Sequence, residues 1–199
     1  SKQMSNEAIA TVFENWNKGP LSSYLLDITS QILRKKEGDK YLLDLILDKA
    51  GNKGTGSWSS KAAFDLGIPN TLMSAAVFAR YISSFKDIRV KMSDLIDPNH
   101  SMTEDINLES IENAYRFARL INHQQGFKLM HLASKSYNWD LNFSDIARIW
   151  SNGCIIKSHL MNQLHNEFKE NQDLFDMNLI VGDLINAESD LCETIMLGL

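Results

Sequence analysis

Cysteine, proline and long apolar runs are all scarce in this chain. Its 199 residues include two cysteines and three prolines. Cys154 and Cys192 are far apart and stand in no metal-ligand spacing, so neither a disulfide framework nor a zinc module is indicated. Free thiols of this kind suit a reducing, cytoplasmic compartment. No stretch approaches about 18 consecutive apolar residues, so no membrane-spanning helix is expected.

Positive charge is also in short supply. Lys and Arg number 20 against 25 Asp and Glu, which gives a net charge of -5. Because no long Lys/Arg-rich run is present, a general nucleic-acid-binding role is not expected. The start of the chain lacks the basic-then-apolar order of a secretory signal and does not begin with Met. It enters a helical pattern almost at once, which favours a piece of a longer protein.

Helical periodicity is what the sequence has in abundance. Ser5 is a candidate N-cap for a first helix that ends near Trp16, and "NKGP" follows it. We expect Gly38 to end the second helix, and "YLLDLILD" fits a short buried helix better than a strand. An apolar stripe at i, i+3, i+4, i+7 and i+11 marks the second helix: Leu21, Tyr24, Leu25, Ile28 and Ile32.

Two further helices are expected around the middle of the chain. Ser59 or Ser60 is a candidate cap for "KAAFDLG", with Gly67 at the position of a C-terminal capping glycine. The next segment, "TLMSAAVFARYISSF", is rich in small residues. A neighbouring backbone can therefore pack closely against it.

The second half of the chain is helical as well. The longest pattern runs from Asn107 to about Tyr137, and the following helix is capped near Asn142 or Ser144. Gly153 interrupts the pattern before "IIKSHLMNQLHNEF" continues it. Because no β-rich block appears, we predict an all-α fold with a long central helix and packed flanking helices. We expect residues 1–199 to form a single domain.

The stretch "GNKGTGSW" nearly matches a nucleotide-binding P-loop, which reads G-x-x-x-x-G-K-[ST]. Gly51 and Gly56 have the required separation. However, Ser57 stands where the phosphate-binding Lys belongs, and Trp58 stands where the magnesium-binding hydroxyl belongs. A nucleotide site is therefore disfavoured.

A site for a single phosphate group is a better interpretation of the same stretch. Its glycines leave the backbone exposed around the cation of Lys53 and the hydroxyl of Thr55. The helix that follows has an N-terminus, which favours anions. Arg80, on the next helix, offers a guanidinium fork for phosphate. An ordinary glycine turn, and an Arg80 that merely packs its stem at the core edge, stay open as alternatives.

Other chemistries receive little support. The histidines show none of the i, i+4 spacing of a zinc-binding H-E-x-x-H helix, so no metal site is predicted. They are His100, His123, His131, His159 and His165. No G-x-S-x-G nucleophile motif is present either.

The segment "DKAGNKGTGSWSSKAAFDLGIPNTLMSAAVFAR" resembles the C-terminal domain of 6-phosphogluconate dehydrogenase. That family carries a similar A-G-x-K-G-T-G-K-W segment, then L-G-x-P and A-V-x-A-R. Further matches are "MSNEAIATVFENWNKGPLSSYLLDIT", "HQQGFKLM", "WDLNFSDIARIW" and "GCIIKS", so the resemblance covers nearly the whole chain.

The resemblance implies an all-α domain that supplies most of a homodimer interface. The family enzyme oxidises 6-phosphogluconate with NADP and decarboxylates the product in the pentose phosphate pathway. Its substrate phosphate is bound by residues that correspond to Lys53, Thr55 and Arg80. The family's NADP-binding domain, its catalytic Lys and Glu helix and its C-terminal tail find no match here. No catalytic residue is therefore expected in this chain, and we expect the chain alone to be inactive.

One residue within the loop departs from the family pattern. Ser57 replaces the Lys that commonly precedes the Trp, which removes a positive charge beside the predicted phosphate. Two alternatives to the 6-phosphogluconate dehydrogenase assignment remain at this point. The chain could belong to a related β-hydroxyacid dehydrogenase, or it could be a non-catalytic helical scaffold.

Overall fold

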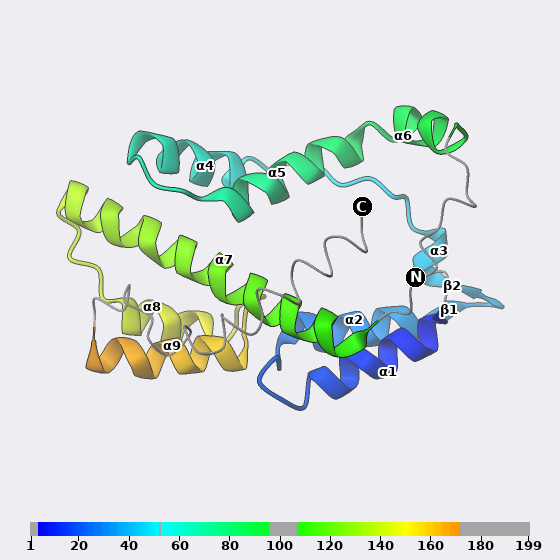
Figure 1. Cartoon of the computed structure of the whole chain (residues 1–199), viewed down its shortest axis with the longest axis horizontal. Helices are drawn as coiled ribbons and strands as arrows, with labels where there is room; N and C mark the ends of the chain where they lie inside the picture. The colour runs from blue at the N-terminus through cyan, green and yellow to red at the C-terminus, as the bar shows by residue number, and fades with distance from the viewer. Residues whose placement is uncertain (1–3, 52, 96–106, 172–199) are drawn as a thin grey trace. The chain divides into compact units, whose positions relative to one another are not determined.

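The computed structural model describes residues 4–51, 53–95 and 107–171. These residues form α-helices and one short β-hairpin, which confirms the all-α prediction (Figure 1). The chain divides into two compact units, whose described parts are 4–47 with 142–171 and 48–51, 53–95 with 107–141. The expectation of a single domain stays a prediction. His100 and Cys192 lie outside the described residues.

The first unit begins with two helices that pack side by side, α1 (Asn6–Trp16) and α2 (Tyr24–Arg34). The Ser5 side chain accepts a hydrogen bond from the Ala8 N–H at 3.2 Å, which confirms the predicted cap and the end at Trp16. Ser23 caps α2 in the same way through the Leu26 N–H at 3.2 Å. Each cap satisfies a backbone donor that the first helical turn leaves unpaired.

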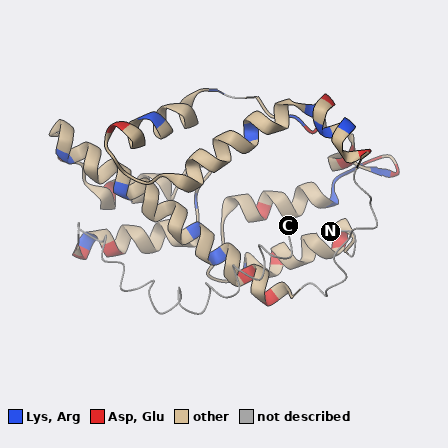
Figure 2. Ribbon diagram, turned by 45° about the horizontal axis from the view of Figure 1, so that its top comes forward, with Lys and Arg blue, Asp and Glu red and all other residues tan. Residues whose placement is uncertain are grey.

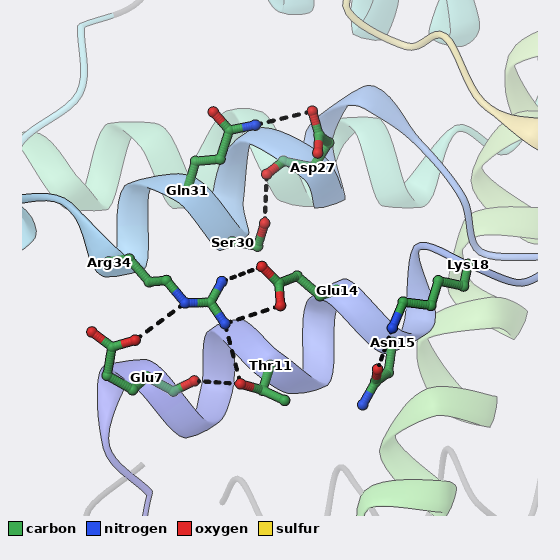
Figure 3. A network of polar contacts seen from close by, with 9 residues as sticks. All are labelled: Glu7, Thr11, Glu14, Asn15, Lys18, Asp27, Ser30, Gln31 and Arg34. Carbon is green, nitrogen blue, oxygen red and sulfur yellow. Dashed lines mark hydrogen bonds and ion pairs between the residues drawn. The ribbon is translucent and has the colours of Figure 1, made fainter.

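A single arginine at the end of α2 ties the two helices together (Figure 3). The Arg34 guanidinium forms an ion pair with Glu7 at 3.1 Å and another with Glu14. It also donates to the Thr11 hydroxyl at 3.1 Å. The pKa of Arg34 is raised, first by its hydrogen bond to Glu14 and further by the charge of Glu14 and by the hydrogen bond and charge of Glu7, while burial opposes this rise. One planar cation therefore fixes three side chains of α1.

The apolar stripe noted in the sequence is only partly covered, because Leu21 is buried while other members of the stripe are exposed. Tyr24, Leu25 and Ile32 are exposed, with 46%, 41% and 42% of their surface accessible. The buried positions are Leu26, Ser30 and Leu33. The helix α2 carries apolar side chains on two sides, and only one of these sides is covered. Periodicity shows such a helix to be amphipathic, but the packing partner selects the side that is covered.

The expectation that Gly38 ends the second helix was wrong. The helix ends at Arg34, and Gly38 instead opens the two-residue turn of a hairpin between β1 (Lys36–Glu37) and β2 (Lys40–Tyr41). Its φ of +60° is the conformation that such a turn requires at its first position. The short helix predicted next is confirmed as α3 (Leu42–Leu45), but none of its residues is buried.

The rest of the first unit is the helix pair α8 (Phe143–Trp150) and α9 (His159–Glu170). Asn142 caps α8 through the Asp145 N–H at 3.0 Å, so the prediction of a cap near this residue is confirmed. The Phe143 and Phe168 rings, whose centroids are 5.7 Å apart, pack the two helices together. Gly153, with a φ of +71°, lies in the break between them.

The caps of α2 and α9 pair with each other. Ser23 and Ser158 form an isolated antiparallel bridge. The Tyr24 N–H donates to Lys157 O at 3.0 Å, and the His159 N–H donates to Ser22 O at 2.9 Å. These bonds join segments that are more than a hundred residues apart in sequence.

The second unit holds α4 (Thr55–Asp65), α5 (Thr71–Ser84), α6 (Lys86–Ser93) and α7 (Leu108–Tyr137). The predicted span of the longest helix is confirmed: Asn107 caps it through the Glu109 N–H at 3.1 Å, and Asn138 ends it in the left-handed conformation. No helix among the described residues is long and apolar enough to cross a membrane.

The start of α4 lies earlier than predicted. Gly54, not Ser59 or Ser60, is its N-cap. Ser60 instead donates to Gly56 O at 3.1 Å, one helical turn back, and Ser59 accepts from Asn70 at 3.2 Å. A serine inside a helix can donate its hydroxyl to a backbone carbonyl of the preceding turn, so a serine alone does not mark a helix start. The correction places the N-terminus of α4 directly beside Lys53.

Candidate phosphate-binding site

The glycine stretch forms a loop that turns abruptly into a helix. Gly54 has a φ of +91°, which is accessible to glycine and strained for residues with a Cβ. Thr55 is the first residue of α4, and Ser57 is the third. The first-turn N–H groups of α4 therefore lie next to the Thr55 hydroxyl, and Lys53 comes immediately before the cap.

Lys53 and Thr55 are both exposed. Neither side chain makes a hydrogen bond or an ion pair with another residue in the described ranges. The Lys53 ammonium and the Thr55 hydroxyl are therefore accessible to a ligand at the N-terminus of α4, where an anion is stabilised.

Arg80 reaches the loop from α5. Its Nε donates to Gly51 O at 3.1 Å, and its Nη2 donates to the same carbonyl oxygen. The structure thus brings Arg80 to the segment that carries Lys53, although the two are 27 positions apart in sequence. Phe78 and Tyr81 beside it are exposed, and their rings form a T-shaped contact with centroids 6.2 Å apart. Arg80 does more than cover apolar surface, because its fork is engaged with the loop backbone.

The segment that leads into the loop is held by two more side chains of the same unit. The Ala50 N–H donates to the Ser83 hydroxyl at 3.1 Å. Arg89 on α6 bridges to Asp48, with Nη1 2.6 Å from the carboxylate and Nη2 2.6 Å from the Asp48 carbonyl oxygen. Its Nη2 also donates to Ser83 O at 3.1 Å. We call residues 48–51 the strap.

The ion pair at the start of the strap perturbs the aspartate. The pKa of Asp48 is lowered, mainly by the hydrogen bond from Arg89 and then by the positive charge of Arg89, with a further contribution from Lys86. Partial desolvation opposes this change. Basic residues of α5 and α6 are drawn in blue in Figure 2.

Helices α4 and α5 interlock closely next to the loop. A Cβ added to Gly56 would lie 2.6 Å from the Val77 Cγ2 atom, so only glycine permits this approach. Ser74 donates to the Ser60 hydroxyl at 3.1 Å across the same interface. The close approach depends on Gly56 of α4, and Ser74 is the small residue of α5 that makes the contact with Ser60. It couples the start of α4 to the helix that carries Arg80.

The N-terminus of α5 has a cap from another helix. Asn70 makes no side-chain capping bond to α5. Instead the Gln125 carbonyl oxygen on α7 accepts from the Leu72 N–H at 3.1 Å, and the Gln125 amide donates to the Thr71 hydroxyl at 2.9 Å. Sequence reasoning missed Gln125, as it missed Asp48, Ser83 and Arg89. Their partners are 33 to 54 positions away, where no local pattern reports them.

The histidines of the described residues form no comparable centre. Within the described ranges no group of three or more His, Cys, Asp or Glu residues is placed to hold a metal ion. His123 on α7 lies 2.7 Å, through Nδ1, from Arg119 O. Burial lowers the pKa of His123, and the nearby Arg119 charge adds to this, while the backbone hydrogen bond opposes it.

A family model described as "6-phosphogluconate dehydrogenase, C-terminal domain" matches residues 1–195. The chain belongs to this family. The resemblance carried by the glycine loop and its flanking motifs is therefore confirmed, together with the all-α fold.

Known 6-phosphogluconate dehydrogenases are similar over most of the chain. The decarboxylating 6-phosphogluconate dehydrogenase of Lactococcus lactis subsp. lactis (strain IL1403) is 43% identical over 185 residues, which are 90% of this chain and 39% of that protein. The Citrobacter freundii enzyme is 43% identical over 180 residues, covering 88% of this chain and 40% of its own length. The chain thus spans about two fifths of these relatives.

A solved structure of Plasmodium falciparum 6-phosphogluconate dehydrogenase has the same fold. It superposes with a TM-score of 0.88 at 37% identity, over 98% of this chain and 44% of that protein. The Plasmodium enzyme is described in its apo form, with its cofactor NADP+ and with its substrate 6-phosphogluconate. The assignment of Lys53, Thr55 and Arg80 as phosphate ligands stays a prediction. The bond from Arg80 to Gly51 supports it by bringing Arg80 to the loop that carries the other two residues.

Proposed function

We propose that this domain provides the substrate phosphate-binding wall of an NADP-dependent, decarboxylating 6-phosphogluconate dehydrogenase. The observation that carries the proposal is the bond of Arg80 to Gly51, because it draws the guanidinium onto the loop that holds Lys53 and Thr55. Membership of the family and the substrate named for the Plasmodium enzyme support the choice of ligand.

Each proposed ligand offers a different kind of contact. Lys53 supplies a mobile point charge, and Thr55 supplies a hydroxyl donor beside the N–H groups of the first turn of α4. Arg80 supplies planar donors, of which Nη1 is not used on Gly51. Such charge-assisted hydrogen bonds are the stronger kind in proteins. Together they bind a dianion at the end of the sugar acid that is remote from the reacting carbon.

In the complete protein NADP accepts a hydride from C3 of the substrate, and the resulting β-keto acid loses carbon dioxide. The residues of this chain act at the other end of the substrate, where they orient the molecule by its phosphate. We assign cofactor binding and proton transfer to the rest of the protein. We further propose that the protein is a cytoplasmic homodimer.

Ser57 gives the proposed site one charge fewer than the common family pattern. It lies in the first turn of α4, where a hydroxyl can still donate to an anion but adds no long-range attraction. We therefore expect Ser57→Lys to lower KM for 6-phosphogluconate at low ionic strength, with the gain shrinking as salt is added.

The proposal is tested by substrate kinetics on the complete natural polypeptide that carries this chain. Arg80→Ala and Lys53→Met should each raise KM for 6-phosphogluconate about tenfold or more, since each removes a charged hydrogen bond. Lys61→Met, which removes an exposed lysine of α4, serves as the matched control. Equal effects of the three substitutions, or an unchanged KM in Arg80→Ala, would contradict the assignment.

A second comparison isolates the phosphate group. Gluconate lacks the phosphate but keeps the rest of the substrate, so its weaker use should be insensitive to Arg80→Ala. The 199-residue chain expressed alone is expected to produce no NADPH from either substrate. NADPH formation by the purified chain would overturn that expectation.

A further inference from the structure

Arg89 does not belong to the proposed ligand set, yet it holds the segment that leads to it. Its guanidinium contacts the Asp48 carboxylate, the Asp48 carbonyl oxygen and the Ser83 carbonyl oxygen. Three acceptors from two segments therefore converge on one rigid, planar group. A single side chain thereby locks the first residue of the strap to the junction of α5 and α6.

The strap is held at three points in succession. Arg89 binds at Asp48, Ser83 binds the N–H of Ala50, and Arg80 binds the carbonyl of Gly51. Ser83 also donates to Arg80 O at 2.8 Å, which links the second anchor to the third. Lys53 follows two residues after the last anchor, so its position depends on the path of the strap.

Arg80 and Arg89 differ in whether a bound ligand would compete for their hydrogen-bond donors. Arg80 has to share its donors between Gly51 and a phosphate in the proposed site. Arg89 faces no such competition, because its two amino groups already have acceptors on the protein. The Arg89 side chain is about one third exposed, and its Nε is buried without a partner in the described ranges.

We propose that Arg89 is a positioning residue for the phosphate-binding loop, which it serves by fixing the strap against α5 and α6. Its clamp on Asp48 sets the register of residues 48–51, and so keeps Gly51 in reach of Arg80 and Lys53 near the start of α4. The kinetic part of this inference rests on the proposed function. The ordering of the strap does not.

Two readouts on the complete natural polypeptide test the inference. The first is amide hydrogen exchange of Ala50 without ligand, because this N–H is bonded only if the strap lies along α5. Arg89→Met should speed its exchange about tenfold by opening the strap locally. The second is the steady-state kinetics of 6-phosphogluconate oxidation, where KM should rise about tenfold while kcat changes less than about twofold.

The split between KM and kcat separates positioning from a loss of stability. A variant that is merely less folded has fewer active molecules, so its apparent kcat falls and its KM is unchanged. Arg89→Lys keeps the charge but cannot reach all three acceptors, and should lie between wild type and Arg89→Met. Asp48→Asn removes the ion pair but keeps the contact between Arg89 and the residue 48 carbonyl oxygen. It should also give an intermediate effect on both readouts, and it replaces Arg89→Met as the test if that variant fails to fold.

Lys91→Met is the matched control, since it removes an exposed cation from the same helix α6 without touching the strap. It should leave both readouts unchanged. The inference is overturned if Ala50 exchange is the same in Arg89→Met and wild type, or if Lys91→Met has an equal effect. If the wild-type protein does not use 6-phosphogluconate, the proposed function fails, and Ala50 exchange still decides whether Arg89 orders the strap.

Discussion

The side chain of Gln125 caps a helix to which it does not belong. Its carbonyl oxygen accepts from the Leu72 N–H at 3.1 Å, so the first turn of α5 is completed by α7. The same amide group donates to Thr71 at 2.9 Å. A long helix thereby determines where the helix that carries Arg80 begins.

Replacing this cap tests how much it contributes. Gln125→Met keeps the length of the side chain but leaves the Leu72 N–H without its acceptor. We expect a loss of about 1 kcal/mol in the free energy of unfolding, the usual effect of removing an N-cap. Urea denaturation measures it, and Gln124→Met is the neighbouring control. Equal stability of the two variants would show that the bond does not contribute.

Two glycines should respond to alanine in opposite directions. Gly56→Ala places a methyl group against Val77, whose β-branched side chain cannot easily turn away. We expect the overpacking to destabilise the protein by about 1–3 kcal/mol. Gly126→Ala, inside α7, meets no described atom within 4 Å. It should stabilise the protein by about 0.5–1 kcal/mol because alanine is the better helix former.

A second substitution identifies the cause of the Gly56 effect. In a Val77→Ala background the added methyl group finds space, so Gly56→Ala should no longer destabilise. Thermal unfolding of the four proteins in this cycle gives the coupling directly. Additive effects would place the origin elsewhere than in the contact with Val77.

Arg34 should contribute more to stability than an ordinary surface arginine. Arg34→Met keeps the aliphatic stem but removes the contacts to Glu7, Thr11 and Glu14. Arg148→Met is the control, because Arg148 has one exposed partner, Asp145, within its own helix. We expect a lower Tm for Arg34→Met than for Arg148→Met, with the difference narrowing in 1 M salt. A larger drop in Arg148→Met would contradict this ranking.

The pH dependence of stability should contain a contribution from His123. Its pKa lies below the ordinary 6.5 because burial disfavours the charged ring. Between the folded pKa and 6.5 the unfolded chain therefore binds more protons than the folded one. Stability contributed by this group is present above pH 6.5 and falls as the pH is lowered toward the folded pKa.

Thermal unfolding from pH 7.5 to 5.5 measures this contribution. His123→Gln should lose less Tm over the range than wild type does. His159→Gln, which replaces an exposed histidine, should keep the wild-type slope. If the slope of His123→Gln equals that of wild type, His123 is not a source of acid sensitivity.

Much of the fold could be predicted from local sequence. Ser5, Asn107 and Asn142 mark helix starts because a side-chain oxygen satisfies donors within its own first turn. The family motifs likewise named Lys53, Thr55 and Arg80 as one site. Both kinds of signal depend on residues that are near in sequence or carried in a recognisable order.

The failures have a common physical origin. Gly38 suits a helix end and a hairpin turn equally well, and Ser59 and Ser60 suit a cap and a helix interior. Only the hydrogen-bond partners that these residues and their neighbours find in the folded structure decide between such alternatives. The buried side of α2 is a choice of the same kind, because packing selects between two apolar faces.

The sequence by itself determined an all-helical chain, the positions of most helix ends and the residues of the candidate phosphate site. Tertiary structure alone decided that Gly51 meets Arg80, that Arg89 clamps Asp48 and that Gln125 caps α5. These contacts join residues 29 to 53 positions apart. Their energies depend on distances between helices, which are set when the helices pack and leave no periodic trace in the chain.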